Sequence, residues 1–470
     1  MTKVRVDNLM EKLVSLAKRR GFVFPGSEIY GGLSNSWDYG PLGVELKNNI
    51  KNLWWKKFVQ QRDDMVGLDA SLLMNTKVWE ASGHLKEFSD PLVECKQCHE
   101  RFRVNESWSD EVWWDLAKKL ENVKSSEREA VVQAALKECP SCGAKNKFAV
   151  PQQFNLMFKT FIGSAESKSS EAYFRPETAQ AIFVNFKNIL GTTRMKLPFG
   201  VAQVGKAFRN EITPGNFIFR TREFEQMEIE YFIREKDWET SFEMWRKAIL
   251  DWINDLGLDL KKIHEFEHPE RELSHYSKKT LDFEYDFPFG QKELYGLAYR
   301  TDFDLKNHEK ASGINLKYRD PDLPTTKGEE FWPHVIEPSL GVDRTVLAVL
   351  LDAYYDTGDH VILKLKPQLA PYKAAVFPLL ANKPALWNFA RSIYLDLKKD
   401  FLVAWDDRGN IGKRYFSQDE IGTPFCITID FDSLENPPAG GDVTVRDRDT
   451  GKQERIKIDK LKEYLTDKLV

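Results

Sequence analysis

Apolar side chains recur at helical spacing in several parts of the chain, and each such pattern predicts a helix. In residues 8–20, Leu9, Leu13 and Leu16 share one face, and Gly21 supplies a stop signal. The same periodicity predicts further helices at about residues 42–59, 237–256 and 344–355.

Other segments have the alternation expected of strands. Residues 150–232 contain short β-like segments, and the run from Phe224 to Phe232 alternates well enough for a half-buried strand. Strand character returns in residues 282–305, and from residue 367 onward strand-like and helical segments alternate. These patterns predict an α+β fold with a central antiparallel sheet flanked by helices, followed by a small α/β unit.

The domain organisation follows from changes in composition along the chain. Residues 93–149 begin with ECKQC, continue through a polar, charged run and end with ECPSCG, so we expect an insertion there. A Pro-containing joint, LKPQLAPYK, marks a boundary near residue 366. The predicted parts are residues 1–92 and 150–365, which form one interrupted domain, the insertion 93–149, and the unit 366–470.

Length and charge narrow the class of protein. A chain of 470 residues suggests two or three domains. The net charge of -4 excludes a uniform positive coat for nucleic acid, although local basic patches remain compatible with RNA that is bound and released. No apolar run approaches the roughly 20 residues of a membrane span. The start, MTKVRVDNLMEKL, lacks the apolar region of a signal peptide, so we expect a cytoplasmic protein.

Charged and aromatic residues recur at strand spacing in FRNE, residues 208–211, and RTREFEQME, residues 220–228. If both runs are strands joined by a turn at ITPGN, Arg209 and Glu211 share one face. Arginine pairs with phosphate oxygens and a Phe can stack on a purine, so this face suits a nucleoside triphosphate. The alternative is a solvated strand face with charge pairs across the hairpin. The second strand would present Arg220, Arg222, Phe224, Gln226 and Glu228.

A second signal is EPSLGVDR, residues 337–344, which opens an apolar helix. Gly341 permits close approach of the backbone to a ligand, and Arg344 in the first helical turn can reach a phosphate. Taken alone, this run is also compatible with a loop followed by an ordinary surface arginine.

The two signals resemble motifs 2 and 3 of the class II aminoacyl-tRNA synthetases, and they occur in the same order. Longer runs resemble glycyl-tRNA synthetases of the dimeric bacterial type, over essentially the whole chain. These runs are SGHLKEF, FRPETAQ, WDYGPLGVELKNNI, HYSKKTLDFEYDFPFG and KRYFSQDEIGTPFCITID. The resemblance implies a homodimer that uses ATP, Mg²⁺, glycine and tRNA(Gly), with residues 366–470 as an anticodon-binding domain.

The resemblance also implies roles for individual residues toward ATP. Arg209 would bind the α-phosphate, Glu211 would accept a hydrogen bond from the adenine amino group, and Phe224 would stack on adenine. Arg220 would hold the γ-phosphate, and Arg344 would lie there or against adenine. Of these, Arg209, Glu211 and Arg344 form the implied catalytic set. The other implied ATP-binding residues are Asn210, Phe219, Thr221, Arg222, Glu223, Leu294, Gly341, Val342 and Asp343, together with Glu293, which would contact the ATP-bound Mg²⁺.

For glycine, the resemblance implies acidic residues that attract the ammonium group and leave no room for a side chain. The reaction needs no side-chain nucleophile, because the carboxylate of glycine can attack the α-phosphorus once arginine and Mg²⁺ relieve charge repulsion. The 3′-terminal ribose of tRNA would then take the glycyl group. The implied glycine-binding residues are Arg101, Glu177, Phe224, Glu225, Gln226, Met227, Glu228, Glu337, Pro338, Ser339, Leu340 and Gly341.

The cysteines indicate a metal site. Cys95 and Cys98 form one CxxC pair, and Cys139 and Cys142 form a second. Four thiolates in two such pairs match tetrahedral Zn²⁺, which we expect to have a structural role. The alternative is a loop with four reduced thiols and no metal.

Three other functions are compatible with parts of this pattern. Motifs 2 and 3 alone would allow a synthetase for another amino acid. A non-catalytic relative that binds tRNA or DNA, such as the mitochondrial polymerase accessory subunit, would not need Arg209, Glu211, Phe224, Glu293 and Arg344 together. A free-standing amide ligase on this fold would lack the C-terminal unit.

Overall fold

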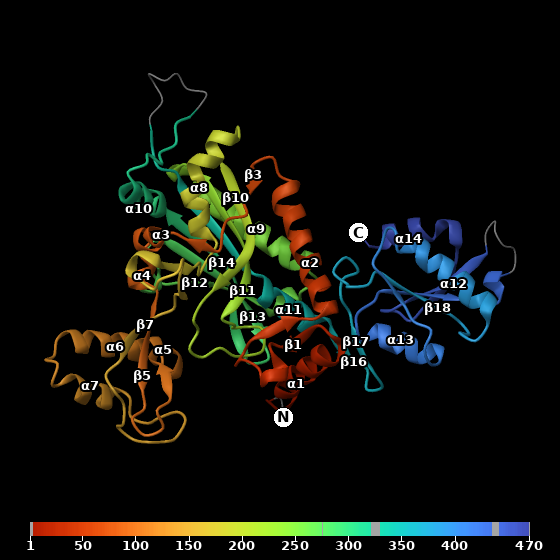
Figure 1. Ribbon diagram of the computed structural model, residues 1–470, viewed down its shortest axis with the longest axis horizontal. Coiled ribbons are helices and arrows are strands. Elements are labelled where there is room, and N and C mark those ends of the chain that lie inside the picture. Colours follow the sequence, from red (N-terminus) through yellow and green to blue (C-terminus); the bar gives the residue numbers. More distant parts are fainter. Residues whose placement is uncertain (1–2, 275, 321–329, 435–440, 470) are drawn as a thin grey trace.

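The computed structural model describes residues 3–274, 276–320, 330–434 and 441–469. His275, which begins one of the runs that carry the resemblance, lies outside these residues. Figure 1 shows a large central body between two smaller parts, the segment near residues 93–149 in orange and the C-terminal part in blue. Within the described residues, no helix has the length and apolar character needed to cross a membrane.

The central body is built on a seven-stranded sheet with the order β12-β13-β14-β15-β11-β10-β3. Neighbouring strands are antiparallel except β3 and β10, which are parallel, so the predicted antiparallel sheet is confirmed. The strands are β3 (Met65–Gly67), β10 (Phe199–Phe208), β11 (Glu223–Ile233), β12 (Ile263–Glu267), β13 (Lys279–Phe287), β14 (Gly290–Thr301) and β15 (His334–Gly341).

Strand β11 is more deeply buried than its sequence predicts. The structure buries every residue from Gln226 to Ile233, although alternation predicted a half-buried strand. Met227 and Ile229 pack in the core on one face of the sheet, and Phe232 packs in the core on the other. The prediction of a half-buried strand is wrong because helices cover both faces, and the alternating polar residues Gln226, Glu228 and Glu230 are buried.

The helices form one layer on each face of the sheet (Figure 1). The predicted helices are confirmed, and the second continues as a π-helical turn, η2 (Lys56–Gln60). The larger core contains residues of α1 (Lys3–Arg20), α2 (Pro41–Trp55), α9 (Trp238–Asp255) and α11 (Val342–Ala353). The opposite core contains residues of α8 (Ala179–Thr192) and α10 (Phe303–Ser312).

Two of these helices were not predicted. Residues 150–232 hold the expected short strands, but α8 also lies among them, and α10 begins just before the end of the region 282–305 that was expected to be strand. The sequence of α8, AQAIFVNFKNILGT, is rich in β-branched and aromatic residues, and Thr178 makes no side-chain cap. Packing of its apolar face against the sheet outweighs these local preferences.

Residues 89–155 form a lobe beside the central body, which includes the segment 93–149 that the composition set apart. Strand β5 (Ser89–Glu94) pairs with β6 (Arg101–Arg103) and β7 (Gln152–Asn155). The helices are α5 (Val104–Ser107), α6 (Asp110–Glu121) and α7 (Arg128–Ala135). The lobe has its own small core, which includes Val93, Leu116 and Phe148.

Shorter elements complete the central body. Those near the lobe are β4 (Leu73–Met74), α3 (Thr76–Ala81), α4 (His84–Glu87), β8 (Lys159–Phe161) and β9 (Glu171–Phe174). Nearer the N-terminus, β1 (Val23–Pro25) pairs with β2 (Trp37–Tyr39).

The C-terminal part confirms the predicted alternation of strands and helices. A hairpin of β16 (Tyr354–Asp356) and β17 (Val361–Leu363) leads into it from the central body. Its sheet has the order β19-β18-β20-β21-β22, with β18 parallel to β19 and β20 and the last two strands antiparallel. The elements are β18 (Ala374–Pro378), α12 (Pro384–Leu397), β19 (Val403–Trp405), α13 (Ile411–Asp419), β20 (Phe425–Ile429), β21 (Asp442–Asp447), β22 (Gln453–Lys457) and α14 (Leu461–Lys468).

Gly43 in α2 provides a test of the packing of this helix against the backbone that follows α1. A Cβ at this position would lie 1.8 Å from the carbonyl oxygen of Phe22, a backbone atom that cannot turn aside. We expect Gly43→Ala to lower the free energy of unfolding by about 1–3 kcal/mol, measured by urea denaturation. The control is Gly191→Ala in α8, where a Cβ would meet nothing within 4 Å. Equal denaturation midpoints for the two variants would contradict this packing.

Candidate active site

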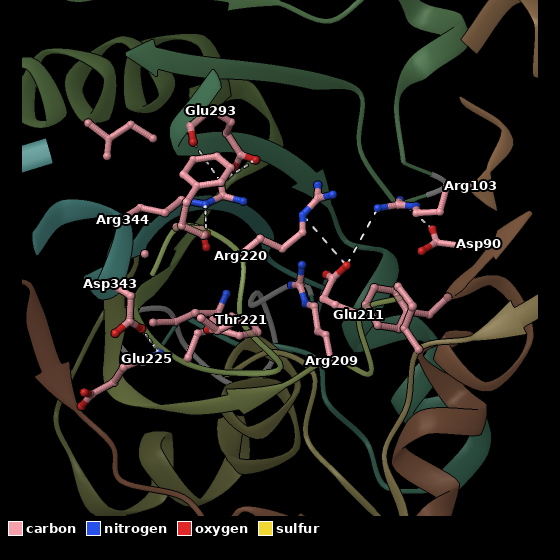
Figure 2. Close-up of a pocket in the computed structure, with 18 of the residues that line it drawn as sticks. Asp90, Arg103, Arg209, Glu211, Arg220, Thr221, Glu225, Glu293, Asp343 and Arg344 are labelled. Atoms are coloured by element: carbon pink, nitrogen blue, oxygen red, sulfur yellow. Dashed lines mark hydrogen bonds and ion pairs between the residues drawn. The ribbon is translucent and has the colours of Figure 1, made fainter. Parts of the chain in front are cut away.

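A pocket of about 370 Å³ lies where β11, β14 and β15 meet the loop that joins β10 to β11. The insertion lobe contributes residues of β5 and β6 to its wall. Figure 2 shows charged side chains from these segments pointing toward one another around the cavity. The lining residues are Glu87, Phe88, Ser89, Asp90, Arg103, Leu156, Arg209, Glu211, Phe219, Arg220, Thr221, Phe224, Glu225, Gln226, Glu293, Leu294, Ser339, Gly341, Asp343 and Arg344.

The loop of residues 209–222 carries the arginines that the sequence placed on strands. Strand pairing ends at Phe208 and Glu223, so the prediction of Arg209 and Glu211 on one strand face is wrong. The loop is longer than a turn at ITPGN requires because Phe217, Ile218 and Phe219 are buried and anchor its tip in the largest core. The loop therefore has a defined shape that holds charged residues over the pocket.

Arg209 lies over an aromatic ring at the centre of the pocket. Its Nε donates to the carbonyl oxygen of Pro176 at 3.0 Å. Its guanidinium carbon lies 5.2 Å from the ring centroid of Phe224 and 5.3 Å from that of Phe88. This cation–π arrangement leaves the terminal nitrogens near the face of Phe224, where a planar base and an anion can both be bound.

Arg344 forms a second aromatic and ionic contact at the other end of the pocket. Its guanidinium carbon lies 4.5 Å from the ring centroid of Phe219. Its Nη1 lies 2.9 Å from Oε2 of Glu293, whose side chain is 47% exposed (Figure 2). An exposed carboxylate next to an arginine can bind a divalent cation while the arginine binds an anion.

Oε2 of Glu211 and Oε1 of Gln226 are buried acceptors of the pocket that have no hydrogen-bond partner among the described residues. Oε2 of Glu211 lies 3.9 Å from Arg103 and 4.0 Å from Arg220. A buried polar atom without a partner costs free energy, so native proteins rarely retain one without a ligand or water. Both atoms are therefore suited to accept hydrogen bonds from a bound molecule.

Asp343 and Glu225 support the pocket. The carboxylate of Asp343 accepts hydrogen bonds from the backbone nitrogen of Glu225 at 2.8 Å, the hydroxyl of Tyr39 at 2.5 Å and Nζ of Lys47 at 3.2 Å. Lys47 and Lys51 in turn pair with Glu225. These contacts join the first turn of α11 to β11 and α2, and so they fix the position of Arg344.

Behind Gln226 and Ser339, the pocket ends in a group of buried acids. Glu228 accepts hydrogen bonds from Oγ of Ser339 at 2.8 Å, and from Oγ1 and the backbone nitrogen of Thr178 at 2.5 and 3.0 Å. These donors hold the carboxylate of Glu228 directly behind the side chain of Ser339, which lines the pocket.

Arg300 on β14 balances part of this negative charge. Its Nη1 donates to Glu337 at 2.7 Å, and its Nε and Nη2 donate to the carboxylate of Asp304 at 2.9 and 3.0 Å. Glu177 lies 3.8 Å from Arg300 and accepts a hydrogen bond from Gln180 at 3.0 Å. One guanidinium group therefore compensates part of the charge of three carboxylates.

The protonation of these acids depends on their neighbours. Burial is the first cause that raises the pKa of Glu228, Glu230 and Glu337. Repulsion from neighbouring carboxylates raises all three further, whereas Arg300 opposes the rise at Glu337. For Glu177, burial would also raise the pKa, but the positive charge of nearby groups, His84 first, lowers it below the ordinary value. Acids with opposite shifts at one end of a pocket are typical of a functional site.

The structure brings most of the residues implied for the site to this pocket or to the acids behind it. Asn210, Arg222 and Glu223 instead line a neighbouring cavity of about 970 Å³. Arg222 donates hydrogen bonds to the carbonyl oxygens of Glu211 and Ser34, so its role here is to hold the loop. Other implied residues are buried away from the pocket. Met227 and Leu340 on the strands and Val342 at the start of α11 belong to the largest core, and Pro338 is also buried.

Arg101 does not reach the pocket in the structure. Its side chain is 62% exposed and its Nε lies 3.1 Å from Oε2 of Glu94 within the lobe. Arg103 lines the pocket instead and donates from Nη2 to Asp90 at 2.7 Å (Figure 2). The sequence offered no means to choose between the two arginines of the RFR run, because strand alternation gives both the same face.

Other residues of the site were missed because no local motif marks them. Arg300 and Asp304 lie where a strand passes into a helix, and Glu230 is two residues beyond Glu228 in the same strand. The signal for Glu230 was present, since it continues the alternation of Gln226 and Glu228. Its role as a buried acid depends on β15 and β14, which the sequence does not align with it.

The four cysteines of the lobe come together as predicted. Their Sγ atoms all lie within 4.8 Å of one another, and the pairs Cys95–Cys142 and Cys98–Cys139 are 3.8 Å apart. A tetrahedron of sulfurs about 2.3 Å from Zn²⁺ has edges of about 3.8 Å, whereas a disulfide needs about 2.05 Å. The residues that follow each pair, His99 and Gly143, both have left-handed backbone conformations, with φ of 59° and 70°. The thiol geometry therefore fits zinc.

Comparison with known proteins agrees with this geometry. Residues 158–354 match the model of the tRNA synthetase class II core domain (G, H, P, S and T), and residues 373–468 match the anticodon binding domain. Proteins named glycine–tRNA ligase are similar over 98% of this chain. The one from Caldanaerobacter subterraneus subsp. tengcongensis is 52% identical and covered over 98% of its length. Those from Alkaliphilus oremlandii and Geobacillus thermodenitrificans are each 53% identical, covered over 99% and 97%. With this similarity along its whole length, and with an arginine-lined pocket that ends in buried acids, the chain belongs to the glycine–tRNA ligase family of class II aminoacyl-tRNA synthetases.

Proposed function

We propose that this chain activates glycine with ATP in the pocket of about 370 Å³ and transfers the glycyl group to tRNA(Gly). The observation that carries the proposal is a cavity that holds Arg209 over Phe224 and the unpartnered acceptors of Glu211 and Gln226, with buried acids behind it. A nucleotide and an ammonium group together supply the anion, the planar ring and the donors that these groups require.

ATP would lie along the row of arginines. Adenine would displace the guanidinium of Arg209 from the face of Phe224 and donate its amino hydrogen to Oε2 of Glu211. Arg209 would then bind the α-phosphate, and Arg220 and Arg344 the outer phosphates. Because these guanidinium groups are positioned before reaction, they stabilise the charge that grows as the carboxylate of glycine attacks.

Mg²⁺ would accompany ATP, and Glu293 is the pocket residue suited to hold it. Its carboxylate is half exposed and is paired with Arg344 rather than buried in a network. Bound Mg²⁺ neutralises phosphate charge. Arg344 and Glu293 would thus place positive and negative groups side by side, one for the phosphates and one for the metal.

Glycine would lie with its ammonium group toward the acids and its carboxylate toward Arg209. Gln226 and Ser339 line the pocket at this end, and Glu228 lies directly behind Ser339. We propose that Glu177, Glu228 and Glu337 attract the ammonium group, and that this packed end leaves no room for the β-methyl group of alanine. Displacing a buried carboxylate to admit that methyl group would leave a charge poorly paired.

The C-terminal unit would bind the anticodon of tRNA, as its match over residues 373–468 suggests. We place the boundaries of the parts at residues 92, 149 and 365, as the composition predicted. A homodimer and a cytoplasmic location are proposed on the resemblance to the family alone. Zinc in the lobe is proposed on the geometry of the four thiols.

Replacement of Arg209 tests the assignment of the reacting phosphate. We expect Arg209→Ala to reduce glycine-dependent ATP–pyrophosphate exchange by about 10²-fold or more, because a positioned charge is lost where negative charge grows. The control is Arg246→Ala on α9, which removes an exposed ion pair with Glu265. Near-normal exchange by folded Arg209→Ala would overturn the assignment.

The two arginines of β6 give a direct comparison. Arg103 lines the pocket near Glu211, whereas Arg101 is exposed and pairs with Glu94. We expect Arg103→Ala to lower kcat/KM for pyrophosphate exchange by about tenfold, since a charge-assisted hydrogen bond contributes about 1.5–3 kcal/mol. Arg101→Ala should remain within about twofold of the unaltered protein. The reverse order would show that Arg101 moves into the site when substrates bind.

The zinc site is tested by metal analysis. We expect one zinc per chain, lost in Cys139→Ser and retained in Cys426→Ala, whose thiol is buried in β20 of the C-terminal sheet. Loss of zinc should increase proteolysis within residues 93–149 first, because Cys95 and Cys139 are part of the small core of the lobe. Zinc-free native protein with four freely titrating thiols would argue for the metal-free alternative.

A further inference from the structure

Glu230 is a fully buried acid in the group behind the pocket, and no motif assigns it a role. It lies on β11 in a row of alternate residues, beyond Gln226 and Glu228 and before Phe232, which belongs to the apolar core. The side chain of Glu230 is 0% exposed. The antiparallel register that joins Glu228 to Ser339 continues to the pair Tyr231 and Ile336, so Glu230 stands opposite Glu337.

The carboxyl group of Glu230 has no hydrogen-bond partner among the described residues. Both of its oxygens are buried and unpaired. A carboxylate oxygen of Glu230, one of Glu228 and one of Glu337 all lie within 4.8 Å of one another. Such an arrangement of three ionised carboxylates is strongly unfavourable in a medium of low polarity, because the repulsion between like charges is poorly screened there.

The positive charge around Glu230 is too small to balance these acids. Arg300 of β14 faces the group, but its nitrogens already donate to Asp304 and Glu337. The other titratable groups that face this cluster are Glu228 of β11, Glu337 of β15, Asp304 and His308 of α10, Glu177 before α8, His84 of α4, and Tyr276. Burial lowers the pKa of His308, so that imidazole adds no charge at neutral pH. His84 lies beside Glu177, 3.4 Å from its carboxylate.

We propose that Glu230 is a positioning residue that carries a proton at neutral pH and shares it with Glu337. As a neutral acid, Glu230 donates a hydrogen bond to the carboxylate opposite it and is no longer a third negative charge. This proposal rests on the proposed function, because the carboxylates that remain ionised are the ones that would receive the ammonium group of glycine.

The physical consequence is a smaller net negative charge in the group of acids behind the pocket. Five buried carboxyl groups face Arg300, with His84 beside one of them, and a single ammonium group cannot compensate the remainder. A proton held at Glu230 lowers the excess negative charge, and the hydrogen bond it makes also orients Glu337. Burial and repulsion by Glu337 raise the pKa of Glu230 well above its ordinary value, in the direction that retains this proton.

Two replacements of similar size test whether Glu230 is needed as a neutral hydrogen-bond donor or as a negative charge. Glu230→Gln keeps a neutral donor in the same place, and Glu230→Met keeps the volume but removes the donor. We expect Glu230→Gln to retain kcat/KM for glycine within about threefold in pyrophosphate exchange at pH 7.5. Glu230→Met should raise KM for glycine by about tenfold or more and leave KM for ATP within about twofold. At higher pH, KM for glycine should rise in the unaltered protein and rise less in Glu230→Gln, which has no proton to lose.

An infrared difference spectrum tests the protonation state without activity. The unaltered protein minus Glu230→Gln should show the C=O stretching band of a protonated carboxyl group at pH 7.5. The control, Glu243→Gln on the exposed surface of α9, should show only a carboxylate band. This spectrum keeps the proposal testable if Glu230→Met does not fold. If the unaltered protein failed to activate glycine, the proposed function would fail while the spectrum would still decide the state of Glu230.

Three outcomes would overturn the proposal. The first is a carboxylate band from Glu230 at neutral pH. The second is a folded Glu230→Gln that loses glycine activation as severely as Glu230→Met, which would mean that the charge is needed. The third is a divalent cation bound one per chain and lost in Glu230→Gln, which would make the three acids a metal site.

Discussion

The pairing of Arg300 with buried carboxylates is the interaction on which the site depends. Its guanidinium donates to Glu337 and Asp304 and lies near Glu177, so three segments of the chain meet at one positive charge. Removing one partner of such a buried pair leaves a charge without compensation and costs several kcal/mol. The same pairing holds β14, β15 and α10 together and holds negative charge where an ammonium group would bind.

Strand β11 connects this charged centre to the pocket and fixes the order of the side chains between them. Its alternate residues Phe224, Gln226 and Glu228 lead from the aromatic face beneath Arg209 to the buried acids. The intervening residues Met227 and Ile229 pack in the largest core. Because the strand is central and paired on both sides, its side chains have little freedom. A base-binding face and an acidic end are therefore held at a fixed separation by backbone geometry.

The insertion lobe completes the pocket from outside the central sheet. Arg103 on β6 approaches Glu211 of the loop, and Asp90 on β5 accepts a hydrogen bond from Arg103. The lobe has a core of only a few residues, and two of the four clustered thiols, those of Cys95 and Cys139, are buried in it. A metal that stabilises a small core would thus also fix one wall of the pocket, which links the structural site to the reaction.

The sequence by itself determined the helices with clear periodicity, the α/β character of the C-terminal part, the grouping of the cysteines and the family. Each of these depends on residues near one another in the chain or on long ordered motifs. Only the tertiary structure decided that β11 is buried on both faces, that residues 179–192 form a helix, and that Arg103 rather than Arg101 lines the pocket. It also showed Arg300, Asp304 and Glu230 beside Glu337. Local patterns indicate which side chains share a face. What packs against that face, and which charges it meets there, depends on strands that lie far apart in the chain.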